Sequence, residues 1–595
     1  MGSSHSYLSD PTSFATEVKG KNEDSNSWKA YDYVIVGEVC TAGSVLAARL
    51  SEDPNVTVLL IEAGTSHEKQ FLTQIPLAWP KILKSSIDWD YQTVTQPRAG
   101  NRQHDVPRGK VLGGSSAINA LIYQHYFAEW ESLGATGWGY KDLYPYFIKS
   151  EEYTPHLGHP RVASSNHGSS GLWKTGYVDA APIHNVVIDA CEELGVKRID
   201  DFNTENGQMA PPPTRSYFAN LDNIISGNSI AVAYLSPDVL RRHNLTVAVT
   251  TVVEKILFDG SDLEPRAIGV EVSKSSSSPK YRIKANREVI ISGGAIATPH
   301  ILLLSGLGPK GELSKVGIKV VRDLPQVGKN YYDHLSSGPI CLRGKPGYTL
   351  DFLNSPIQAV FAMLQWLLFN KGPMTNLTAP GAAFVRVDDE KLPYSSKSAS
   401  GVPVRANKTG PNTPDLEIVW FPLVIGGFGV QTPPGVYGTT VGPVLLKPES
   451  SGTITLKSAS VYDKPVIDPN FLASENDLNV LVRGVRFSQR IGRTKRVDGI
   501  LEPRSDSTDT KDFFYMGDAD PDRITDEEIK EFIRGHCSAA FHPTCRRLEL
   551  RVFGVKGLRV VDASVFPNQI SGHPVAVVVA IAEKAVDIIK ADATS

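Results

Sequence analysis

The feature that most constrains the fold is a compact strand, helix and strand near the start of the chain, at residues 31–64. YDYVIV is a continuous apolar run that suits a buried parallel strand, AGSVLAARLSE has helical periodicity, and VTVLLIEAG is a second apolar strand. Units of this kind open dinucleotide-binding folds. We therefore expect an α/β chain with a nucleotide site at the turn that follows the first strand.

The turn between that strand and the helix carries the phosphate-binding prediction. Glycines there let the backbone approach a pyrophosphate, and the N-terminus of the helix supplies N–H donors. Glu62 ends the second strand, where an acidic residue binds the ribose hydroxyls. The candidate residues of the turn and the helix start are Gly37, Thr41, Ala42 and Gly43.

The same turn departs from the dinucleotide fingerprint. It spans seven residues from Gly37 to Gly43, where G-x-G-x-x-G has six, and it lacks the middle glycine. Glu38 also adds a negative charge beside the expected phosphates. Three interpretations stay open: the loop bulges and still binds a dinucleotide, the chain has lost the cofactor, or the sequence carries a gene-model error here.

Composition and net charge narrow the classes of partner and of site that the chain can have. The 595 residues carry 61 basic and 64 acidic side chains, and a net charge of −3 gives no overall field to attract nucleic acid or an anionic membrane. Five scattered cysteines without C-x-x-C spacing predict neither disulfides nor a zinc site, and we expect no metal. Residues 1–28 contain no apolar run typical of a signal peptide, which favours a cytoplasmic location. The expected partner is a small molecule.

Three other segments give local predictions. Residues 357–369 form the longest apolar stretch, which is too short for the roughly 20 residues of a bilayer crossing, so we expect a buried or channel-lining helix. SSSSP at 275–279 predicts a hairpin tip between strands at 267–273 and 281–285. A strongly apolar helix is expected over 575–589.

Two long motifs lie further along the chain. PRGKVLGGSSAIN occupies 107–119 and GAIATPHILLLSGLG occupies 294–308. DWDYQTVTQP precedes the first motif, PQVGKNYYDH follows the second at 325–334, and VKGLRVVDASVFP comes near the end. From about Tyr31 to Lys590 the chain resembles the glucose-methanol-choline (GMC) oxidoreductases, a flavoprotein family.

The resemblance implies a two-part α/β (α+β) molecule, in which a Rossmann-like FAD-binding domain joins a substrate domain of antiparallel sheet and helices. The implied boundaries are a polar tail at 1–29, an FAD-binding domain at 30–175, 226–344 and 536–595, and a substrate-binding domain at 176–225 and 345–535. The FAD-binding residues that it implies are Arg108, Val111, Gly113, Gly114, Ser115, Asn119, Val253, Asp562, Ala563 and Pro574. One family variant tethers FAD through a histidine at the position of Ile118, so the flavin here is expected to be non-covalent.

The resemblance also implies two catalytic residues, His542 in AAFHPTC and His573 in ISGHPVA. In the family, one histidine near the flavin accepts the hydroxyl proton of an alcohol, and a second His or Asn fixes the substrate oxygen. Imidazole suits proton transfer because its pKa lies near neutrality. The AAFHPTC motif around His542 is shorter than the family's H-P-x-G-T-C, so we expect its backbone to follow a different path.

Three functions stay open. The first is FAD-dependent oxidation of the CH–OH group of a small aromatic or hydrophobic alcohol, because residues 345–534 supply many aromatic side chains. The second is a redox-neutral relative in a biosynthetic pathway, a lyase, dehydratase or cyclase with structural or lost FAD, and the third is a non-catalytic protein. The aromatic residues in question are Tyr348, Phe352, Phe361, Trp366, Phe369, Trp420, Phe421 and Phe428.

Overall fold

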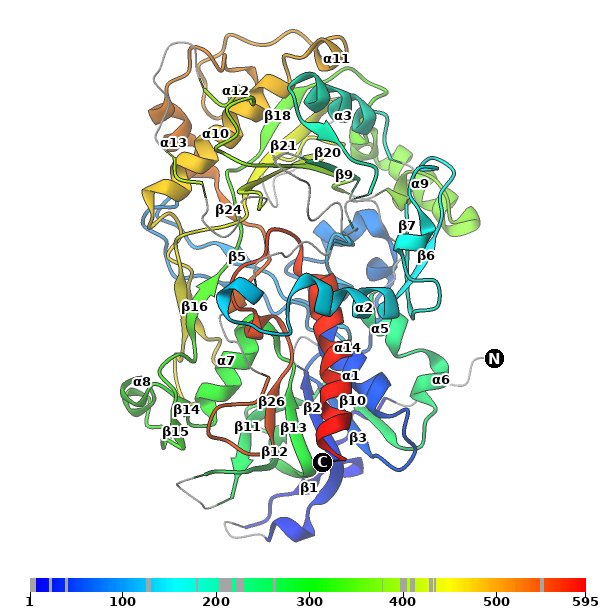
Figure 1. Ribbon diagram of the computed structural model, residues 1–595, viewed down its shortest axis with the longest axis vertical. Helices are drawn as coiled ribbons and strands as arrows, with labels where there is room; N and C mark the ends of the chain where they lie inside the picture. The colour runs from blue at the N-terminus through cyan, green and yellow to red at the C-terminus, as the bar shows by residue number, and fades with distance from the viewer. Residues whose placement is uncertain are drawn as a thin grey trace.

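The computed structural model places two β-sheets toward opposite ends of the long axis of the molecule (Figure 1). The C-terminal helix, α14 (Pro574–Asp592), starts between them and runs toward the lower sheet. The structure describes residues 7–594 apart from 21–23, 38–40, 125–129, 178–179, 202, 204–216, 221–228, 260–263, 377, 396–403, 407–412, 427–431, 433–434 and 546–549.

The first sheet has the strand order β10-β3-β2-β13-β12-β11, and β1 and β26 also pair with β13. The pairs among β10, β3, β2, β13 and β26 are parallel, whereas β11, β12 and β13 form an antiparallel meander. The strands are β1 (Thr16–Glu17), β2 (Lys29–Gly37), β3 (Val58–Glu62), β10 (Leu245–Ala248), β11 (Val252–Phe258), β12 (Ala267–Ser273), β13 (Tyr281–Ile291) and β26 (Leu558–Val560).

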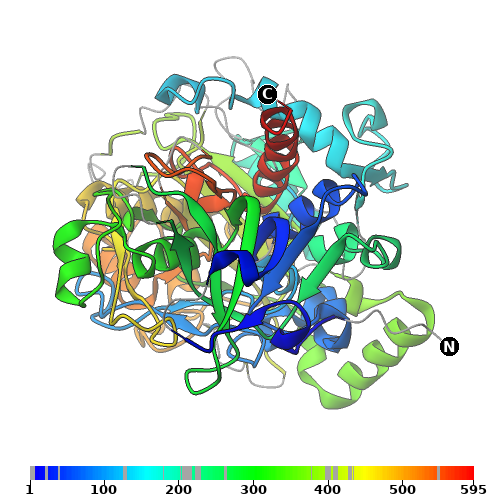
Figure 2. The ribbon, with the colours of Figure 1, turned by 90° about the horizontal axis from the view of Figure 1, so that it is seen from below.

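The opening unit predicted from the sequence is confirmed. Helix α1 (Thr41–Leu50) connects β2 to β3, whose parallel register sets Gly37 opposite Glu62. All of β3 is buried, as a strand covered on both faces must be. Figure 2, seen from below, shows α1 and α14 on the same side of this sheet, and the two helices pack against each other.

Two more local predictions about this sheet can be compared with the structure. The SSSSP loop does connect β12 to β13, although β13 continues to Ile291 rather than ending at residue 285. Within the stretch predicted as a polar tail, β1 pairs with β13 and Phe14 is completely buried in the first core. A buried apolar side chain and a short strand pairing thus hold this polar segment against the sheet.

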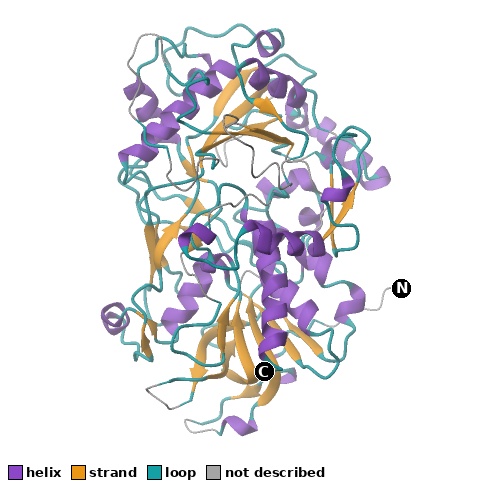
Figure 3. Cartoon of the chain, viewed as in Figure 1, coloured by secondary structure: helices purple, strands orange, loops and turns teal. Residues whose placement is uncertain are grey.

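The second sheet has the order β24-β17-β21-β20-β19-β9-β8, with β18 also paired to β21. Figure 3 shows it as the upper group of strands, with helices above it. The strands are β8 (Lys197–Arg198), β9 (Tyr217–Asn220), β17 (Leu335–Ser336), β18 (Ile340–Arg343), β19 (Gly381–Val385), β20 (Leu416–Phe421), β21 (Gly438–Leu445) and β24 (Ser538–Ala539). The helices are α3 (Ile183–Glu193), α10 (Glu475–Ile491), α11 (Lys495–Asp498), α12 (Tyr515–Asp518) and α13 (Asp526–His536).

Each large sheet has its own hydrophobic core. One core contains the first sheet with α1 and α14, and the other contains the second sheet with α3, α10 and α13. The predicted α/β (α+β) class is therefore confirmed, while the exact domain boundaries stay a prediction. β17 and β18 come before residue 344, yet they pair in the second sheet.

A smaller sheet connects the two halves, in the order β23-β22-β16-β25. Its strands are β16 (Lys329–Tyr332), β22 (Gly452–Thr455), β23 (Val466–Asp468) and β25 (Thr544–Cys545). Two-stranded pairs are β4 (Tyr91–Gln92) with β5 (Asp105–Val106), β6 (Glu151–Thr154) with β7 (Trp173–Gly176), and β14 (Leu307–Gly308) with β15 (Arg322–Asp323). The other helices are α2 (Tyr140–Ser150), α5 (Ile230–Tyr234), α6 (Pro237–Leu240), α7 (Gly294–Leu304), α8 (Lys310–Lys315) and α9 (Pro356–Phe369).

Helix α9 corrects one prediction. The apolar stretch at 357–369 does form a helix, but only Ala362 and Trp366 are buried, and the expectation of a buried or channel-lining helix is wrong. An apolar composition predicts that a segment avoids water, but it does not specify which surface covers it. Among the described residues, we find no helix with the length and apolarity that a bilayer crossing requires.

Candidate active site

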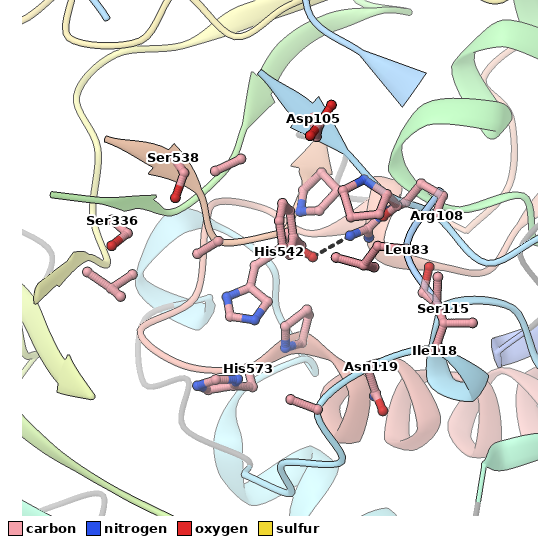
Figure 4. A pocket seen from close by; sticks show the side chains of 18 of the residues that line it. Leu83, Asp105, Arg108, Ser115, Ile118, Asn119, Ser336, Ser538, His542 and His573 are labelled. Carbon is pink, nitrogen blue, oxygen red and sulfur yellow. Dashed lines mark hydrogen bonds between the residues drawn. The ribbon is translucent and has the colours of Figure 1, made fainter. Parts of the chain in front are cut away.

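A cavity of about 520 Å³ lies between the two large sheets. Its floor comes from the starts of α1, α7 and α14, and its roof comes from β20 and β21 of the second sheet. Figure 4 shows part of this cavity, with His542 and His573 on one side and Ser115, Ile118 and Asn119 on the other. Residues from very distant parts of the sequence therefore meet in one space.

The start of α1 reaches the cavity. Thr41 and Ala42 line it, and the Thr41 hydroxyl donates a hydrogen bond to the carbonyl oxygen of Gly113 at 3.1 Å. Gly113 and Gly114 have φ angles of +93° and +58°, which favour glycine because other residues are strained there. The irregular part of the turn, residues 38–40, lies outside the described residues.

The residues predicted to bind the adenosine lie together at the edge of the first sheet. Glu62 is buried, and one of its carboxylate oxygens accepts a hydrogen bond from the Gly64 N–H at 2.7 Å. The backbone N–H of Thr251 donates to the Glu62 carbonyl oxygen at 3.1 Å, which brings Val253 on β11 close to the end of β3. Neither Glu62 nor Val253 lines the open cavity.

Several other predicted cofactor residues lie behind the cavity surface rather than on it: Gly37, Gly43, Val111, Gly113 and Gly114. Val111 is fully buried against Ile82 and Ile87, so it supports the adjoining glycine loop through packing. Arg108, Ser115 and Asn119 do line the cavity, and their role in binding FAD stays a prediction.

Asp562 joins two of the cavity's elements. Its carboxylate accepts hydrogen bonds from the Gly294 N–H at 2.9 Å, from the Thr298 hydroxyl at 2.6 Å and from the Ser564 N–H at 2.7 Å. Burial raises the pKa of Asp562 above its usual value, although these hydrogen bonds oppose that rise. The carboxylate thus fixes the start of α7 beside Ala563, and both line the cavity.

These residues fit a flavin nucleotide. The N-terminal turns of α1 and α14 open into the cavity, and helix N-termini favour anionic groups and hydrogen-bond acceptors. Pro574 begins α14 without giving up a needed donor, because the first N–H groups of a helix have no partner within it. Ile118, which also lines the cavity, offers no nucleophile for a covalent bond to FAD.

The shortened loop around His542 is held by contacts from three directions. The His542 N–H donates to the Asp333 carboxylate at 2.8 Å, and the Gln569 side-chain amide donates to the His542 carbonyl oxygen at 2.8 Å. Strand β25, which begins two residues further on, pairs with β16. Residues 546–549 lie outside the described part of the chain.

The hydrogen bonds of His542 define its tautomer. Nε2 of His334 is 2.9 Å from the carbonyl oxygen of Ile570, which can only accept, so Nε2 carries the hydrogen. Burial lowers the pKa of His334 to about 3, so that ring is neutral and its Nδ1 is an acceptor. The Nδ1 of His542 lies 3.0 Å from it and must donate.

The other ring nitrogen of His542 is consequently a free base. Burial, followed by the neighbouring imidazoles, lowers the pKa of His542 well below its ordinary value, so the ring is neutral. With its hydrogen on Nδ1, the lone pair sits on Nε2. His542 lines the cavity, and this nitrogen is the basic atom that it can offer there.

His573 has a different partner. Its Nε2 lies 3.0 Å from a carboxylate oxygen of Glu417, a buried residue of β20, so Nε2 carries a hydrogen that it donates. The His542 and His573 rings lie edge to face, with centroids 4.5 Å apart and planes at 66° (Figure 4). Two imidazoles with separate hydrogen-bond partners thus adjoin in the cavity.

Sequence reasoning missed the residues behind these imidazoles: Glu417, His334, Asp333 and Gln569. The PQVGKNYYDH motif contains two of them, but no role was assigned to either. Glu417 sits in the apolar run LEIVWF, where a single acidic residue in a buried strand was the available signal.

Most of the aromatic residues expected to form the pocket do not line the cavity. Phe421 lines the cavity, Trp420 is buried in the second core, and Phe361 and Phe369 are exposed. Phe428 lies outside the described residues. Of the eight predicted aromatic residues, Phe421 is the one among the described lining residues, which are otherwise chiefly aliphatic or small.

Known proteins resemble this chain over nearly its whole length. The family model described as GMC oxidoreductase matches residues 31–336 in its N-terminal part and 448–582 in its C-terminal part. The dehydrogenase str4 of Strobilurus tenacellus is 40% identical over 620 aligned positions that cover 99% of this chain and 100% of the relative. Mitochondrial choline dehydrogenase of Homo sapiens is 33% identical, over 95% of this chain and 91% of that protein.

A solved structure agrees with this result. The structure of a formate oxidase variant from Aspergillus oryzae superposes with a TM-score of 0.81 at 26% identity, and it covers 95% of this chain and 98% of its own. That structure addresses FAD modification in the oxidase, so the neighbour carries FAD.

Proposed function

This chain belongs to the GMC oxidoreductase family and is an FAD-dependent oxidoreductase, and from that premise we propose that it oxidises the CH–OH group of a small hydrophobic alcohol. The observation that carries the proposal is the pair of imidazoles in the cavity, of which His542 is neutral and has its lone pair on Nε2, an atom without a hydrogen-bond partner among the described residues. Bound FAD would supply the redox chemistry as the acceptor of the hydride from the carbinol carbon.

The proton step is assigned to His542. A neutral imidazole whose lone pair faces a cavity can accept the hydroxyl proton of an alcohol, and general-base assistance of this kind contributes about 10²- to 10⁴-fold. The contact with His334 keeps the hydrogen of His542 on Nδ1, so the ring does not have to change tautomer before it acts.

His573 is assigned to orientation of the substrate oxygen. Glu417 fixes the ring through the Nε2 hydrogen bond, and the ring also stands at the N-cap of α14. A ring held by Glu417 on a backbone fixed by the helix start loses little freedom when a substrate binds, and positioning of this kind supports rate because small displacements are costly. The side-chain oxygen of Gln124 also accepts a hydrogen bond from the backbone N–H of His573 at 3.4 Å.

The hydrophobic substrate class is supported by the cavity wall. Beyond the imidazoles, the lining contains many apolar side chains and few charged groups. The large apolar lining residues are Trp79, Leu83, Ile118, Ile122, Ile296, Val419, Phe421, Ile425, Val444, Phe541, Val575 and Val578.

Relatives support the same reaction class. A choline dehydrogenase of Homo sapiens and an alcohol dehydrogenase [acceptor] of Pseudomonas putida, the latter 32% identical over 94% of this chain, carry names that refer to alcohol substrates. Their names bear on the CH–OH reaction, and the particular alcohol is chosen by the wall of this cavity.

An anaerobic titration tests the proposal. The purified protein with its flavin is mixed with short aliphatic and benzylic alcohols without oxygen, and the flavin absorbance is followed while the product is measured. We expect bleaching of the flavin and one aldehyde or ketone formed for each flavin bleached. Product formation while the flavin stays oxidised would instead identify a redox-neutral enzyme, and no product with any alcohol would contradict the proposal.

A further inference from the structure

Helix α9 presents an unusually apolar surface. None of its 14 residues is charged, and Ile357, Phe361 and Leu368 are exposed by 68%, 64% and 70%. Seven of the fourteen large apolar side chains that are exposed among the described residues belong to this one helix. Soluble proteins rarely expose contiguous apolar patches of this kind without a binding purpose.

The exposed side chains form one continuous stripe. At 100° per residue, the side chains at 357, 360, 361, 364, 367 and 368 fall within an arc of about 120°. Ala362 and Trp366 lie on the opposite side and are buried against the protein. A helix on a water-facing surface normally carries polar residues along its outer arc, whereas here this arc is apolar and the exposed Gln358 and Gln365 lie to one side of it.

A neighbouring turn places two more exposed apolar side chains beside α9. Phe71, in the 3-10 turn η4 (Phe71–Gln74), packs edge to face on Trp366 with ring centroids 5.9 Å apart, and Phe71 and Leu72 are both exposed. Figures 1 and 2 both show α9 at the outer edge of the molecule. We call this surface the apolar ridge; it consists of Phe71, Leu72, Ile357, Val360, Phe361, Leu364, Leu367, Leu368 and Phe369.

Positive charge borders the apolar ridge. Segments 68–84 and 355–378 together contain four lysines and one acidic residue, Glu68, whereas the whole chain has a net charge of −3. Lys371 follows α9 closely and Lys81 ends the turn η5 (Pro76–Lys81), and both are exposed. The turn η5 contacts η10 (Pro373–Thr375), which in turn contacts α9.

We propose that the apolar ridge is a membrane-docking surface that lies in the headgroup layer of an anionic bilayer without crossing it. A convex, uncharged helix needs a fluid apolar partner, and acyl chains provide one without a preformed groove. Lysines at its border attract anionic lipids. A second copy of this chain is a poorer partner, because a two-fold contact would bring the same lysines face to face.

The ridge also adjoins the cavity. Trp79, in η5, lines the cavity and donates from its ring N–H to the Thr378 hydroxyl at 2.6 Å, and Leu83 just beyond η5 lines it too. The segment that borders the ridge is therefore the same segment that forms one cavity wall. Docking on a bilayer would bring that wall close to a source of hydrophobic molecules.

Flotation with vesicles tests the proposal on the full-length, flavin-loaded protein. Vesicles of phosphatidylcholine with one part in four of phosphatidylserine are compared with vesicles of phosphatidylcholine alone. We expect the protein to float with the anionic vesicles, and to float less as salt is added. The double variant Leu364→Glu/Leu368→Glu should bind at least about tenfold more weakly, because two charges must enter the apolar layer.

Matched variants separate the ridge from a general effect of charge. Phe553→Glu and Leu157→Glu add a charge at other sites exposed by 68% and 99%, and they should float like the unchanged protein. Lys81→Gln/Lys371→Gln leaves the apolar side chains intact and should reduce binding to the anionic vesicles only. The flavin spectrum and the melting temperature establish that each variant is folded.

The proposal fails under either of two results. If the unchanged protein floats with neither kind of vesicle, or if the double glutamate variant floats as well as the unchanged protein, the ridge does not bind lipid. Sedimentation without lipid tests whether a second copy of this chain covers the ridge instead. If the unchanged protein is a dimer that does not bind vesicles, and Leu364→Glu/Leu368→Glu converts it to a monomer, the ridge is a dimer interface.

Discussion

His542 and His573 line one cavity, yet the residues that contact each of them from behind differ. We call these two sets of residues the wall of His542 and the wall of His573. Behind His542 stand a neutral imidazole, a backbone carbonyl and a side-chain amide, whereas behind His573 stands the carboxylate of Glu417. The first wall leaves a free basic nitrogen on His542, and the second keeps a hydrogen on Nε2 of His573. Two side chains of the same type are thereby suited to different roles in the proposed reaction.

The two walls also differ in how they hold the backbone. His573 caps a 19-residue helix, so regular structure alone fixes where its Cα lies. His542 sits in a short irregular loop, and its position depends on Asp333, Gln569 and the pairing of β25 with β16. Changes in the first wall should therefore affect geometry and chemistry together, whereas changes at Glu417 should affect chemistry mainly.

The largest effect is expected for His542→Gln. Loss of the base should lower kcat about 10³-fold, within the 10²- to 10⁴-fold that general-base catalysis supplies, while KM changes little. Rapid-mixing measurement of flavin reduction by the alcohol checks this directly. His243→Ala, which changes an exposed histidine away from the cavity, is the control and should behave like the unchanged enzyme. Equal rates for the two variants would remove His542 from the proton step.

Glu417 comes next in expected size. A hydrogen bond to a charged group contributes about 1.5–3 kcal/mol, so Glu417→Ala should lower kcat about 10- to 100-fold by leaving Nε2 of His573 without its acceptor. Glu417→Gln keeps an oxygen that can accept and should lose less. The pH profile of kcat separates the two roles of this side chain, because a purely structural effect would not move it. Unchanged profiles in both variants would show that the carboxylate does not govern His573.

His334 should have a smaller effect. Its Nδ1 accepts a hydrogen bond between neutral rings, which contributes about 0.5–1.5 kcal/mol, so His334→Leu should lower kcat about two- to tenfold. His334→Gln can restore an acceptor and should recover part of the loss. We expect kcat to fall while KM stays, because the ring of His542 then samples both tautomers. A larger loss in Gln than in Leu would contradict the assigned tautomer.

The sequence predicted the parts of the fold whose causes are local. The β2, α1 and β3 unit, the hairpin at 275–279 and helix α14 each follow from apolar periodicity and turn residues within one short segment. The exposure of α9 did not follow, because whether an apolar helix is covered depends on residues elsewhere in the chain. Phe361 and Phe369 were assigned to a pocket for the same reason.

The site divides along the same line. His542 and His573 were found because each lies in a motif of neighbouring residues. Glu417 is 156 positions away from His573 and His334 is 208 positions away from His542, so no local pattern connects them. A residue that acts through a partner far away in the sequence forms no local motif with it, so the sequence alone does not show that the two lie together.

The smallest effect concerns Asp333, which shares the wall of His542. Burial raises the pKa of Asp333 to about 7, and Arg108 opposes that rise; one carboxylate oxygen is buried without a partner among the described residues. Since an aspartate in the unfolded chain loses its proton near the ordinary pKa of 3.8, the folded state binds more protons between about pH 4 and 7. The contribution of Asp333 to the free energy of unfolding is therefore present below pH 4 and is lost as pH rises through 7.

Asp333→Asn removes that titration and keeps an oxygen that can accept from the His542 N–H. The variant should melt at the same temperature as the unchanged protein at pH 4, and about 1–3 °C higher at pH 8, where the unchanged protein holds a buried charge. Melting curves at the two pH values measure the difference, and Asp333→Ala, which lacks the acceptor, should be less stable than the Asn variant at both. If Asp333→Asn were the less stable protein at pH 8, the carboxylate would be stabilising through its attraction to Arg108, and the wall of His542 would depend on an ion pair.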